Sequence, residues 1–531
     1  MRKFILLSLI GLLILAFGAT VYAQKKEEPK LDFKASGFAE MCSFWNRNVP
    51  GLNAAQTIFG ASSSYTTPKE TGVDSKAYNR SVGYLDYRGH LKFDAVMGKE
   101  LSGTIYFEMD STRWGDTPGG QGGKLSERGT LGYWNTDRAA IEIKNLYFDV
   151  AIPYFGIPAP MTARIGAHAL SIRPQLFVYT DAMGISGGIK ADPVMIQPMW
   201  FKALEGTDYT ADDVDVYGLH LNAKIDAITI GTYGLYYNLN TYPIFVSETQ
   251  TDSGGDTLPT ALNKLSQGTQ RAEMFWWGFY ADGKVGPVNI NFDFILDDGK
   301  VESRKTPTAK DVDYSGWASR LKVDYPWEKF NFGVVGMYAT GADMKKTDAT
   351  GLPGKTVAYG SAYGESRKVG SYVVPPGSEA GPVFAGYFDS VVFYAINASS
   401  SGGTGWANGV NGNTMNRGPV GGTWYAKLYG SYKLTPDYKV TLQGLYIGDT
   451  TKNGNTFGTA VKPSGVKRDD KDIGWELDLI NEIQLYKNLK WVIGAGILFA
   501  GDALDMKKSS GNVNDSPDNP WQITTRLTYS F

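Results

Sequence analysis

The amino-acid sequence predicts an all-β fold, a transmembrane antiparallel up-and-down β-barrel of about eighteen strands. Three observations predict it. Segments of about ten residues alternate between apolar and polar side chains, and short turns and long loops separate these segments in turn. The mean hydropathy is −0.24 although 13% of the residues are aromatic. A membrane barrel has this average because half of each strand faces water.

The N-terminal segment has the pattern of a secretory signal peptide. Arg2 and Lys3 precede an uncharged apolar run over residues 4–23, and Val21 and Ala23 suit cleavage ahead of Gln24. An uncleaved anchor helix is the alternative, because the run could just span a bilayer. We expect residues 1–23 to be removed, residues 24–30 to form a short periplasmic tail, and residues 31–531 to form one barrel.

The alternation is clearest in the second predicted strand. The odd positions of residues 85–95 are apolar or glycine, whereas the even positions carry only charged or imidazole side chains. A strand with such faces fits a wall between lipid and water better than the core of a soluble sandwich. The last twelve residues, PWQITTRLTYSF, alternate in the same way and end on Phe531. The predicted strands cover residues 31–41, 85–95, 101–111, 139–152, 161–169, 183–190, 194–204, 213–225, 227–239, 274–283, 288–297, 314–325, 330–340, 422–434, 438–449, 473–485, 489–500 and 520–531.

Two of these strands are weak. Pro198 makes the segment 194–204 a weaker prediction of a central strand, because proline lacks the backbone N–H that pairing with a neighbouring strand requires. Without this segment and its neighbour 183–190 the count falls to sixteen. Segment 139–152 changes parity near Asn145, which indicates a β-bulge. The short turns are expected at the periplasmic end and the long loops outside the cell, as in bacterial barrels.

The longest loop, residues 341–421, is rich in Gly, Ser, Asn and Tyr. A barrel of this strand number leaves an aqueous channel unless something fills it. The loop therefore either folds inward and narrows the channel or lies at the surface.

Charged side chains on the polar parities are candidates for pore lining. Both signs occur among them in similar number, so they do not predict a preference for anions or cations. They either support the wall by pairing or set the field across the lumen, and one residue can do both. The pore-lining candidates are Arg88, His90, Lys92, Asp94, Glu108, Arg164, His168, His220, Asp293, Arg320, Lys322, Asp324, Lys427, Glu476, Asp478 and Arg526.

Several classes of function do not fit the sequence. A formal net charge of −2 gives no basic footprint for nucleic acid. The three histidines fall on strands spaced around the wall, which does not suit a metal site or a Ser–His hydrolase. The single cysteine cannot form an intramolecular disulfide. We expect no enzyme activity, no cofactor and no bound metal.

The chain resembles Gram-negative outer-membrane porins in pattern over the whole mature length. The terminal strand ending in Phe531 resembles the signal that the barrel-assembly machinery of that class reads. Residues 143–153, IKNLYFDVAIP, with the following RIGAHALSIRP and TDAMGISG, resemble a strand pair and loop of porin-like proteins of the alginate-export kind. Residues 473–502 resemble the penultimate hairpin of the same group.

The resemblance implies an outer-membrane location, contact with membrane lipid and passive transport, and porins are often homotrimers. It does not extend to a set of substrate residues. The sequence thus predicts a water-filled channel for passive diffusion of small hydrophilic solutes or ions. The alternative is a substrate-specific exporter or sheath barrel that encloses a polymer or a partner protein.

Overall fold

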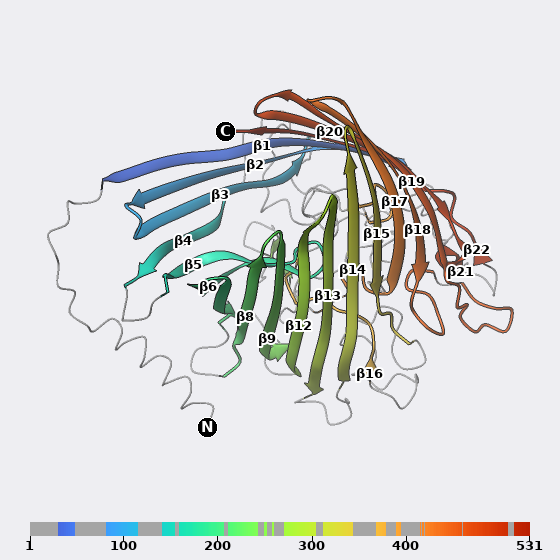
Figure 1. Ribbon diagram of the computed structural model, residues 1–531. Coiled ribbons are helices and arrows are strands. Elements are labelled where there is room, and N and C mark those ends of the chain that lie inside the picture. The colour runs from blue at the N-terminus through green and yellow to red at the C-terminus, as the bar shows by residue number, and fades with distance from the viewer. Residues whose placement is uncertain are drawn as a thin grey trace.

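Backbone hydrogen bonds join eighteen long strands into one closed antiparallel barrel (Figure 1). The main sheet contains nineteen strands, and the additional one, β16 (Lys368–Val369), is a two-residue strand parallel to β14. The prediction of an up-and-down barrel of eighteen strands is therefore confirmed. The wall strands are β1 (Leu31–Arg47), β2 (Ser81–Met97), β3 (Leu101–Arg113), β4 (Glu142–Ile152), β5 (Met161–Ile172), β6 (Val178–Ala191), β7 (Val194–Leu204), β8 (Val214–Ile225), β9 (Ile228–Tyr242), β12 (Gln270–Val285), β13 (Val288–Ser303), β14 (Val312–Trp327), β15 (Phe330–Ala339), β17 (Thr423–Thr435), β18 (Tyr438–Asp449), β19 (Asp472–Tyr486), β20 (Leu489–Ala500) and β23 (Trp521–Ser530).

The computed structural model describes most of the chain, with gaps. A few short elements lie outside the wall: the hairpin β10 (Thr249–Thr251) and β11 (Thr257–Pro259), the pair β21 (Met506–Lys507) and β22 (Asn514–Asp515), and the 3-10 turn η2 (Asp502–Leu504). None of the described helical residues forms a helix long and apolar enough to cross a membrane. The described residues are 30–47, 81–114, 141–153, 159–205, 211–242, 249–251, 257–259, 270–303, 312–343, 368–378, 389–394, 415, 417–418, 420–458, 460–507 and 514–531.

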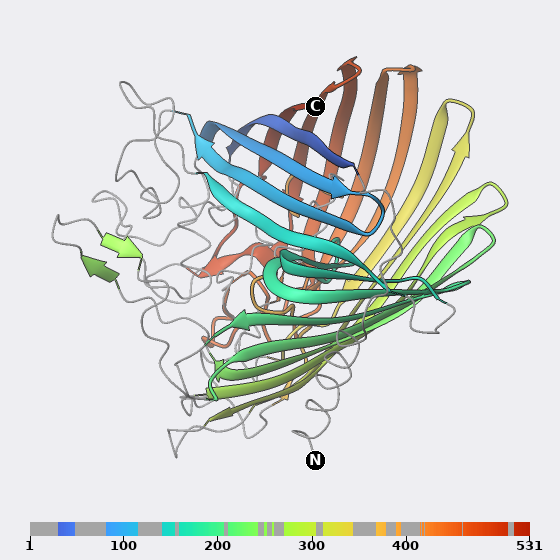
Figure 2. The same ribbon diagram turned by 90° about the vertical axis from the view of Figure 1, so that its left-hand side faces the viewer.

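The first and last strands close the barrel. β1 pairs with β23 in a register that runs from Phe38 opposite Ser530 to Arg47 opposite Trp521. Figures 1 and 2 show the blue first strand beside the red C-terminal strands. Gly37 and Phe531 exchange backbone hydrogen bonds of 2.9 and 3.0 Å, which extends the ladder to the last residue. Closure leaves no sheet edge, as lipid requires.

The outer face of the wall is apolar and exposed. Leu428, Leu442 and Leu477, on β17, β18 and β19, are each at least half exposed. Aromatic side chains stack between strands toward both ends, as in the pairs Trp317–Tyr338 and Trp327–Phe330, with ring centroids 5.0 and 5.9 Å apart. An exposed apolar surface of this extent suits lipid, and aromatic girdles lie at the two membrane interfaces of such barrels. The barrel is of the transmembrane, outer-membrane type.

The long-loop ends of several strands extend beyond their predicted ranges. β13 continues from the predicted end at residue 297 to Ser303, and β12 begins at Gln270 instead of residue 274. The added residues are polar or mixed, and they keep the backbone ladder, as Gln270 opposite Ser303 shows. Alternation between apolar and polar residues therefore marks the part of a strand that spans lipid and not its full hydrogen-bonded length.

The prediction that Pro198 keeps residues 194–204 from forming a central strand is wrong, because β7 spans these residues and pairs on both sides. β7 pairs with β6 on both sides of the proline, with Ser186 opposite Met199 and Ile189 opposite Ile196, and the pairing is interrupted between them. Gly187 lies against the proline ring, where a Cβ would come within 2.9 Å of Pro198 Cγ. A glycine on the neighbouring strand thus accommodates the residue that lacks an N–H.

The predicted bulge near Asn145 is present. Tyr106 pairs with Asn145 and Phe107 pairs with Ile143, so one residue of β4, Lys144, is left over. The bulge turns Lys144 inward, where its Nζ lies 2.8 Å from Glu108 Oε2.

The parity of the wall can be tested on two neighbouring residues. Leu527 faces outward near the middle of β23, and Thr528 faces the lumen beside Glu40. Leu527→Arg should destabilise the folded barrel by about 2–4 kcal/mol, because a charge would face lipid. Thr528→Arg should leave the stability nearly unchanged. Urea unfolding of the two variants in lipid vesicles measures the difference, and equal stabilities would contradict the assigned faces.

Candidate functional site in the barrel lumen

Glu108 is the centre of a charged network on the inner face of β2–β4. It accepts hydrogen bonds from Arg88, from His90 Nε2 at 2.8 Å and from Lys144 Nζ at 2.8 Å. Lys144 also lies 3.1 Å from Asp181 on β6. Glu108 is buried, so its charge needs these three donors. Lys144 was missed in the sequence because its position has outward parity until the bulge is taken into account.

A second ion pair on this side of the lumen is open to water. Arg164 on β5 binds Asp149 on β4 through two hydrogen bonds of 2.8 and 3.0 Å. The guanidinium also lies 4.1 Å from the centre of the Tyr147 ring. The two charged side chains are 42% and 38% exposed, so both remain available to a solute in the lumen.

The lumen-facing histidines do not come together. His168 contacts Ser186 Oγ at 2.7 Å, and His220 contacts the Tyr280 hydroxyl at 3.0 Å, whereas His90 belongs to the Glu108 network. Among the described residues no group of three His, Cys, Asp or Glu side chains is arranged to hold a metal ion.

The loop between β5 and β6, residues 173–177, folds into the barrel. Arg173 pairs with Asp282 on β12 and with Asp293 on β13, and Gln175 Nε2 donates to Asp293 Oδ2 at 3.2 Å. Phe177 is fully buried and stacks on Tyr233 of β9, with ring centroids 5.3 Å apart. This loop therefore covers the inner face of β9–β13 through the two ion pairs of Arg173, the hydrogen bond of Gln175 and the aromatic contact of Phe177.

Residues 368–378 of the longest loop lie against the same region. The indole of Trp276 on β12 donates to the Val373 carbonyl at 2.8 Å, and the Val373 N–H donates to Asp297 Oδ2 at 3.1 Å. The Tyr372 hydroxyl reaches the Leu176 carbonyl at 3.1 Å, so the two loops also bind each other. A buried apolar core thus forms inside the barrel between the wall and these loops.

Residues 389–394 of the same loop bind the adjoining part of the inner wall, from β14 onward. Asp389 pairs with Arg320 of β14 at 2.9 Å and with Lys427 of β17 at 2.7 Å, and it accepts the Tyr425 hydroxyl at 3.1 Å. Burial raises the pKa of Asp389, but Lys427 and Arg320 outweigh this effect and hold its pKa well below the usual range. Asp389 therefore stays ionised at any ordinary pH.

Two glycines of β20 make room for this segment. The Val391 side chain lies over Gly494 and Gly496, where an added Cβ would come within 3.3 and 2.9 Å of it. A Cβ on Gly496 would also lie 2.1 Å from Asp478 Oδ1. The Gln522 amide of β23 donates to the Val391 carbonyl at 2.8 Å. Glycine is thus required here for the close approach of a second chain segment.

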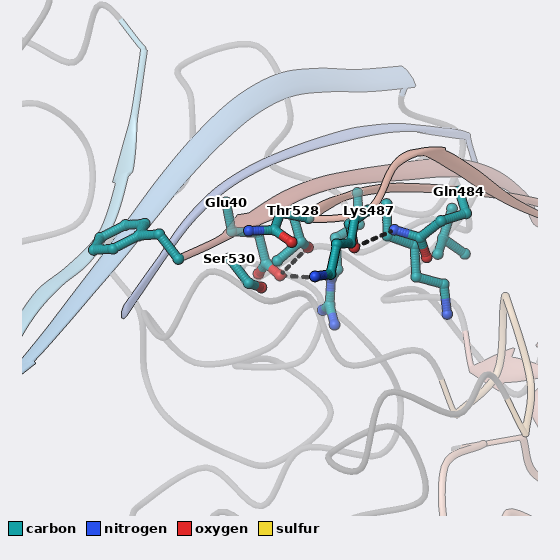
Figure 3. A pocket seen from close by; sticks show the side chains of 10 residues that line it. Glu40, Gln484, Lys487, Thr528 and Ser530 are labelled. Atoms are coloured by element: carbon teal, nitrogen blue, oxygen red, sulfur yellow. Dashed lines mark hydrogen bonds and ion pairs between the residues drawn. The ribbon is translucent and has the colours of Figure 1, made fainter. Parts of the chain in front are cut away.

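An open cavity of about 570 Å³ lies at the short-turn end of the lumen. It is formed by the turn between β19 and β20 and by the last residues of β23. Figure 3 shows Glu40, Thr528 and Ser530 on one side of it, with Lys487 and Gln484 toward the other. Lys490, also in its lining, pairs with Glu482 at 2.8 Å.

The sixteen pore-lining candidates divide by burial into two groups. Partly exposed are Arg88, Lys92, Asp94, Arg164, His220, Lys322, Asp324 and Arg526. Buried are His90, Glu108, His168, Asp293, Arg320, Lys427, Glu476 and Asp478.

The β5–β6 loop and the longest loop bury five of the eight candidates in the buried group. Asp293, Arg320, Lys427, Glu476 and Asp478 are in contact with inward loop residues. Sequence reasoning missed the loop partners Arg173 and Asp389, because polar residues in loops carry no periodic signal. The role of all sixteen in lining a passage stays a prediction.

Comparison with known proteins finds similarity in structure only. No protein-family model matches the sequence, and no curated protein matches it. Solved structures of three proteins of Pseudomonas aeruginosa are similar. OccK11 (OpdR) has 11% identity, with 96% of this chain and 99% of that chain covered and a TM-score of 0.44. OpdQ has 9% identity, coverage of 94% and 98% and a TM-score of 0.46. OccK8 (OprE) has 9% identity, coverage of 94% and 98% and a TM-score of 0.45.

The requirement for glycine at position 496 can be tested by adding one methyl group. Gly496→Ala should weaken docking of residues 389–394 by about 1–3 kcal/mol, because the methyl group overlaps Asp478 and Val391. Chymotrypsin should then cleave the folded barrel faster next to Phe393 and Tyr394, which are fully buried when docked. Gly336→Ala is the matched control, because a Cβ there meets nothing within 4 Å. Equal cleavage of both variants would contradict the requirement for glycine at position 496.

Proposed function

We propose that the protein is an outer-membrane channel through which small hydrophilic solutes or ions diffuse passively. The observation that carries this proposal is the arrangement of charge inside the barrel. Partly exposed ion pairs occupy the inner face of β2–β5, as Arg164 with Asp149 and Lys92 with Asp94 illustrate. Charged side chains that remain accessible on an inward face keep a lumen wet.

The inward segments support a narrowed channel. Residues 173–177, 368–378 and 389–394 are fixed to the inner face of β9–β20 by buried hydrogen bonds and ion pairs. A barrel of this strand number is wide enough for an aqueous channel. We propose that loop 341–421 reduces this width on one side, so that solutes pass beside the charged face of β2–β5.

The short turns, the start of β1 and the end of β23 lie at the same end of the barrel, which we assign to the periplasm by the general rule for bacterial barrels. Under this assignment the cavity beside Phe531 is at the periplasmic mouth. The signal peptide over residues 1–23, recognition of Phe531 by the barrel-assembly machinery and a homotrimeric state remain part of the proposal.

The channel can be tested by electrical recording. Purified protein in planar lipid bilayers should produce stepwise increases of current in simple salt solutions. Folded protein that inserts without any current would refute the channel and would favour the alternative, a barrel that encloses a polymer or a partner protein. A difference in gel mobility between unheated and heated samples, which marks a folded barrel, distinguishes this outcome from misfolding.

The role of the exposed ion pair can be tested by reversing one charge. Arg164→Glu changes the lumen charge by −2 and leaves Asp149 without its partner, so the channel should shift toward cations. The reversal potential under a salt gradient measures this shift. Lys190→Glu, the same change at an exposed position beside the β6–β7 turn, should have a much smaller effect. Identical potentials for both variants would place Arg164 away from the path of the ions.

A further inference from the structure

Glu476 on β19 is the main anchor of residues 389–394 inside the barrel. Its carboxylate accepts the N–H groups of Val391 and Val392 at 2.8 Å, the N–H of Phe393 at 2.9 Å and the Ser390 hydroxyl at 2.8 Å. Glu476 is 0% exposed. Four donors converging on one buried carboxylate offset the cost of removing it from water.

A second carboxyl group, Asp478, lies in the same place. The Val391 N–H that donates to Glu476 also reaches Asp478 Oδ2, at 3.2 Å, and the Gln443 amide donates to that oxygen at 2.8 Å. Asp478 is 1% exposed, and the shared Val391 N–H places its carboxyl group beside that of Glu476. No ion pair joins either carboxyl group to a lysine or arginine in the described part of the chain.

The other oxygen of Asp478 has no donor. Asp478 Oδ1 has no hydrogen-bond partner, and neither does the buried Oε1 of Gln522. The two residues flank Gly496, which pairs with Asp478 on one side and with Gln522 on the other. A buried carboxylate oxygen without a donor is costly when it is charged, and a proton on Asp478 would remove that charge.

We propose that Glu476 and Asp478 together bind one proton when residues 389–394 are docked. Because of this proton, the docking of residues 389–394, which we call the latch, depends on pH and regulates the width of the lumen. The inference rests on the proposed channel function, which it extends to regulation. Two adjacent buried carboxyl groups without a cation cannot both ionise at low cost, so one stays protonated. Glu476 has the four donors and carries the charge, and Asp478 carries the proton.

Among the described residues, the other charged groups around the pair do not provide the missing cation. Lys427 on β17 lies 3.4 Å from Gln443 Oε1, but it is paired with Asp389 of the latch segment. Arg320 on β14 is paired with the same carboxylate. β20 contributes only Gly494 and Gly496 at this point, and β23 contributes the neutral Gln522. Asp389 stays ionised, so among the described charged groups around the docked segment we assign the exchangeable proton to the carboxyl pair on β19.

The direction of the response follows from the number of protons bound. When the segment leaves, water reaches both carboxyl groups, and at neutral pH both lose their protons as ordinary carboxylic acids do. Docking therefore takes up one proton. Low pH favours the docked, narrower lumen and high pH releases the segment, with at most a tenfold change of the equilibrium per pH unit.

Conductance in planar bilayers between about pH 5 and pH 9 tests the latch, since this window lies above the pKa of an exposed carboxyl group. The wild-type conductance should rise with pH. Asp478→Asn, which mimics the protonated acid, should keep the low conductance throughout. Glu476→Gln, which removes the anchoring charge, should show high conductance throughout. The control Asp226→Asn, in the exposed turn between β8 and β9, should respond as the wild type does.

A second measurement does not depend on current. In a Cys42→Ala background, Val391→Cys places a thiol over Gly494 and Gly496 while keeping the backbone donors. Its rate of modification by a small maleimide, divided by that of an exposed Lys487→Cys reference, should rise at least fivefold from low to high pH. Adding Asp478→Asn should remove the rise.

The outcomes separate the two proposals. Absence of current in folded wild-type protein would overturn the channel, whereas the labelling ratio would still decide the latch. A labelling ratio and a conductance that stay constant with pH would overturn the latch and leave the channel intact. A pH response that persists in Asp478→Asn would also overturn the latch, because the shared proton would not be its cause.

Discussion

The structure depends on one constraint: every backbone N–H and C=O within the bilayer must find a partner in the protein itself. The antiparallel ladder meets this demand around the whole wall, and the pairing of β1 with β23 removes the last free edge. Closure also divides the side chains strictly between lipid and lumen, because neighbouring residues of a strand point to opposite faces. The apolar exterior and the charged interior are two results of the same closure.

The interior is not a uniform polar surface. On β9–β20 the inner face carries apolar side chains such as Trp276 and Tyr233, and the loops bury them. Where charged residues occur under the loops, each has a partner supplied by a loop: Arg173 for Asp293, Asp389 for Lys427, and backbone donors for Glu476. On β2–β5 the charged residues are paired along the wall and remain partly exposed. One barrel thus combines a filled side with an open, charged side.

The latch follows from this combination. Residues 389–394 cannot be held by apolar contacts alone, because the part of the wall beneath Val391 carries the polar side chains of Asp478 and Gln522. It uses a carboxylate with four donors, and the second carboxyl group beside it makes the arrangement sensitive to protons. Gly494 and Gly496 permit the close approach that brings both carboxyl groups to one backbone N–H.

The sequence by itself determined the barrel of about eighteen strands, the two faces of most strands, the bulge at Asn145 and the closing position of the last strand. These follow from local alternation, which lipid and water impose residue by residue. Only the tertiary structure decided that Lys144 joins the Glu108 network, that Pro198 is tolerated opposite Gly187, and that Asp389 lies between Arg320 and Lys427. Those contacts join residues far apart in the chain through loops without periodicity. These contacts depend on which parts of the inner wall lie near each loop in the closed barrel. A local sequence pattern carries no information about that spatial proximity.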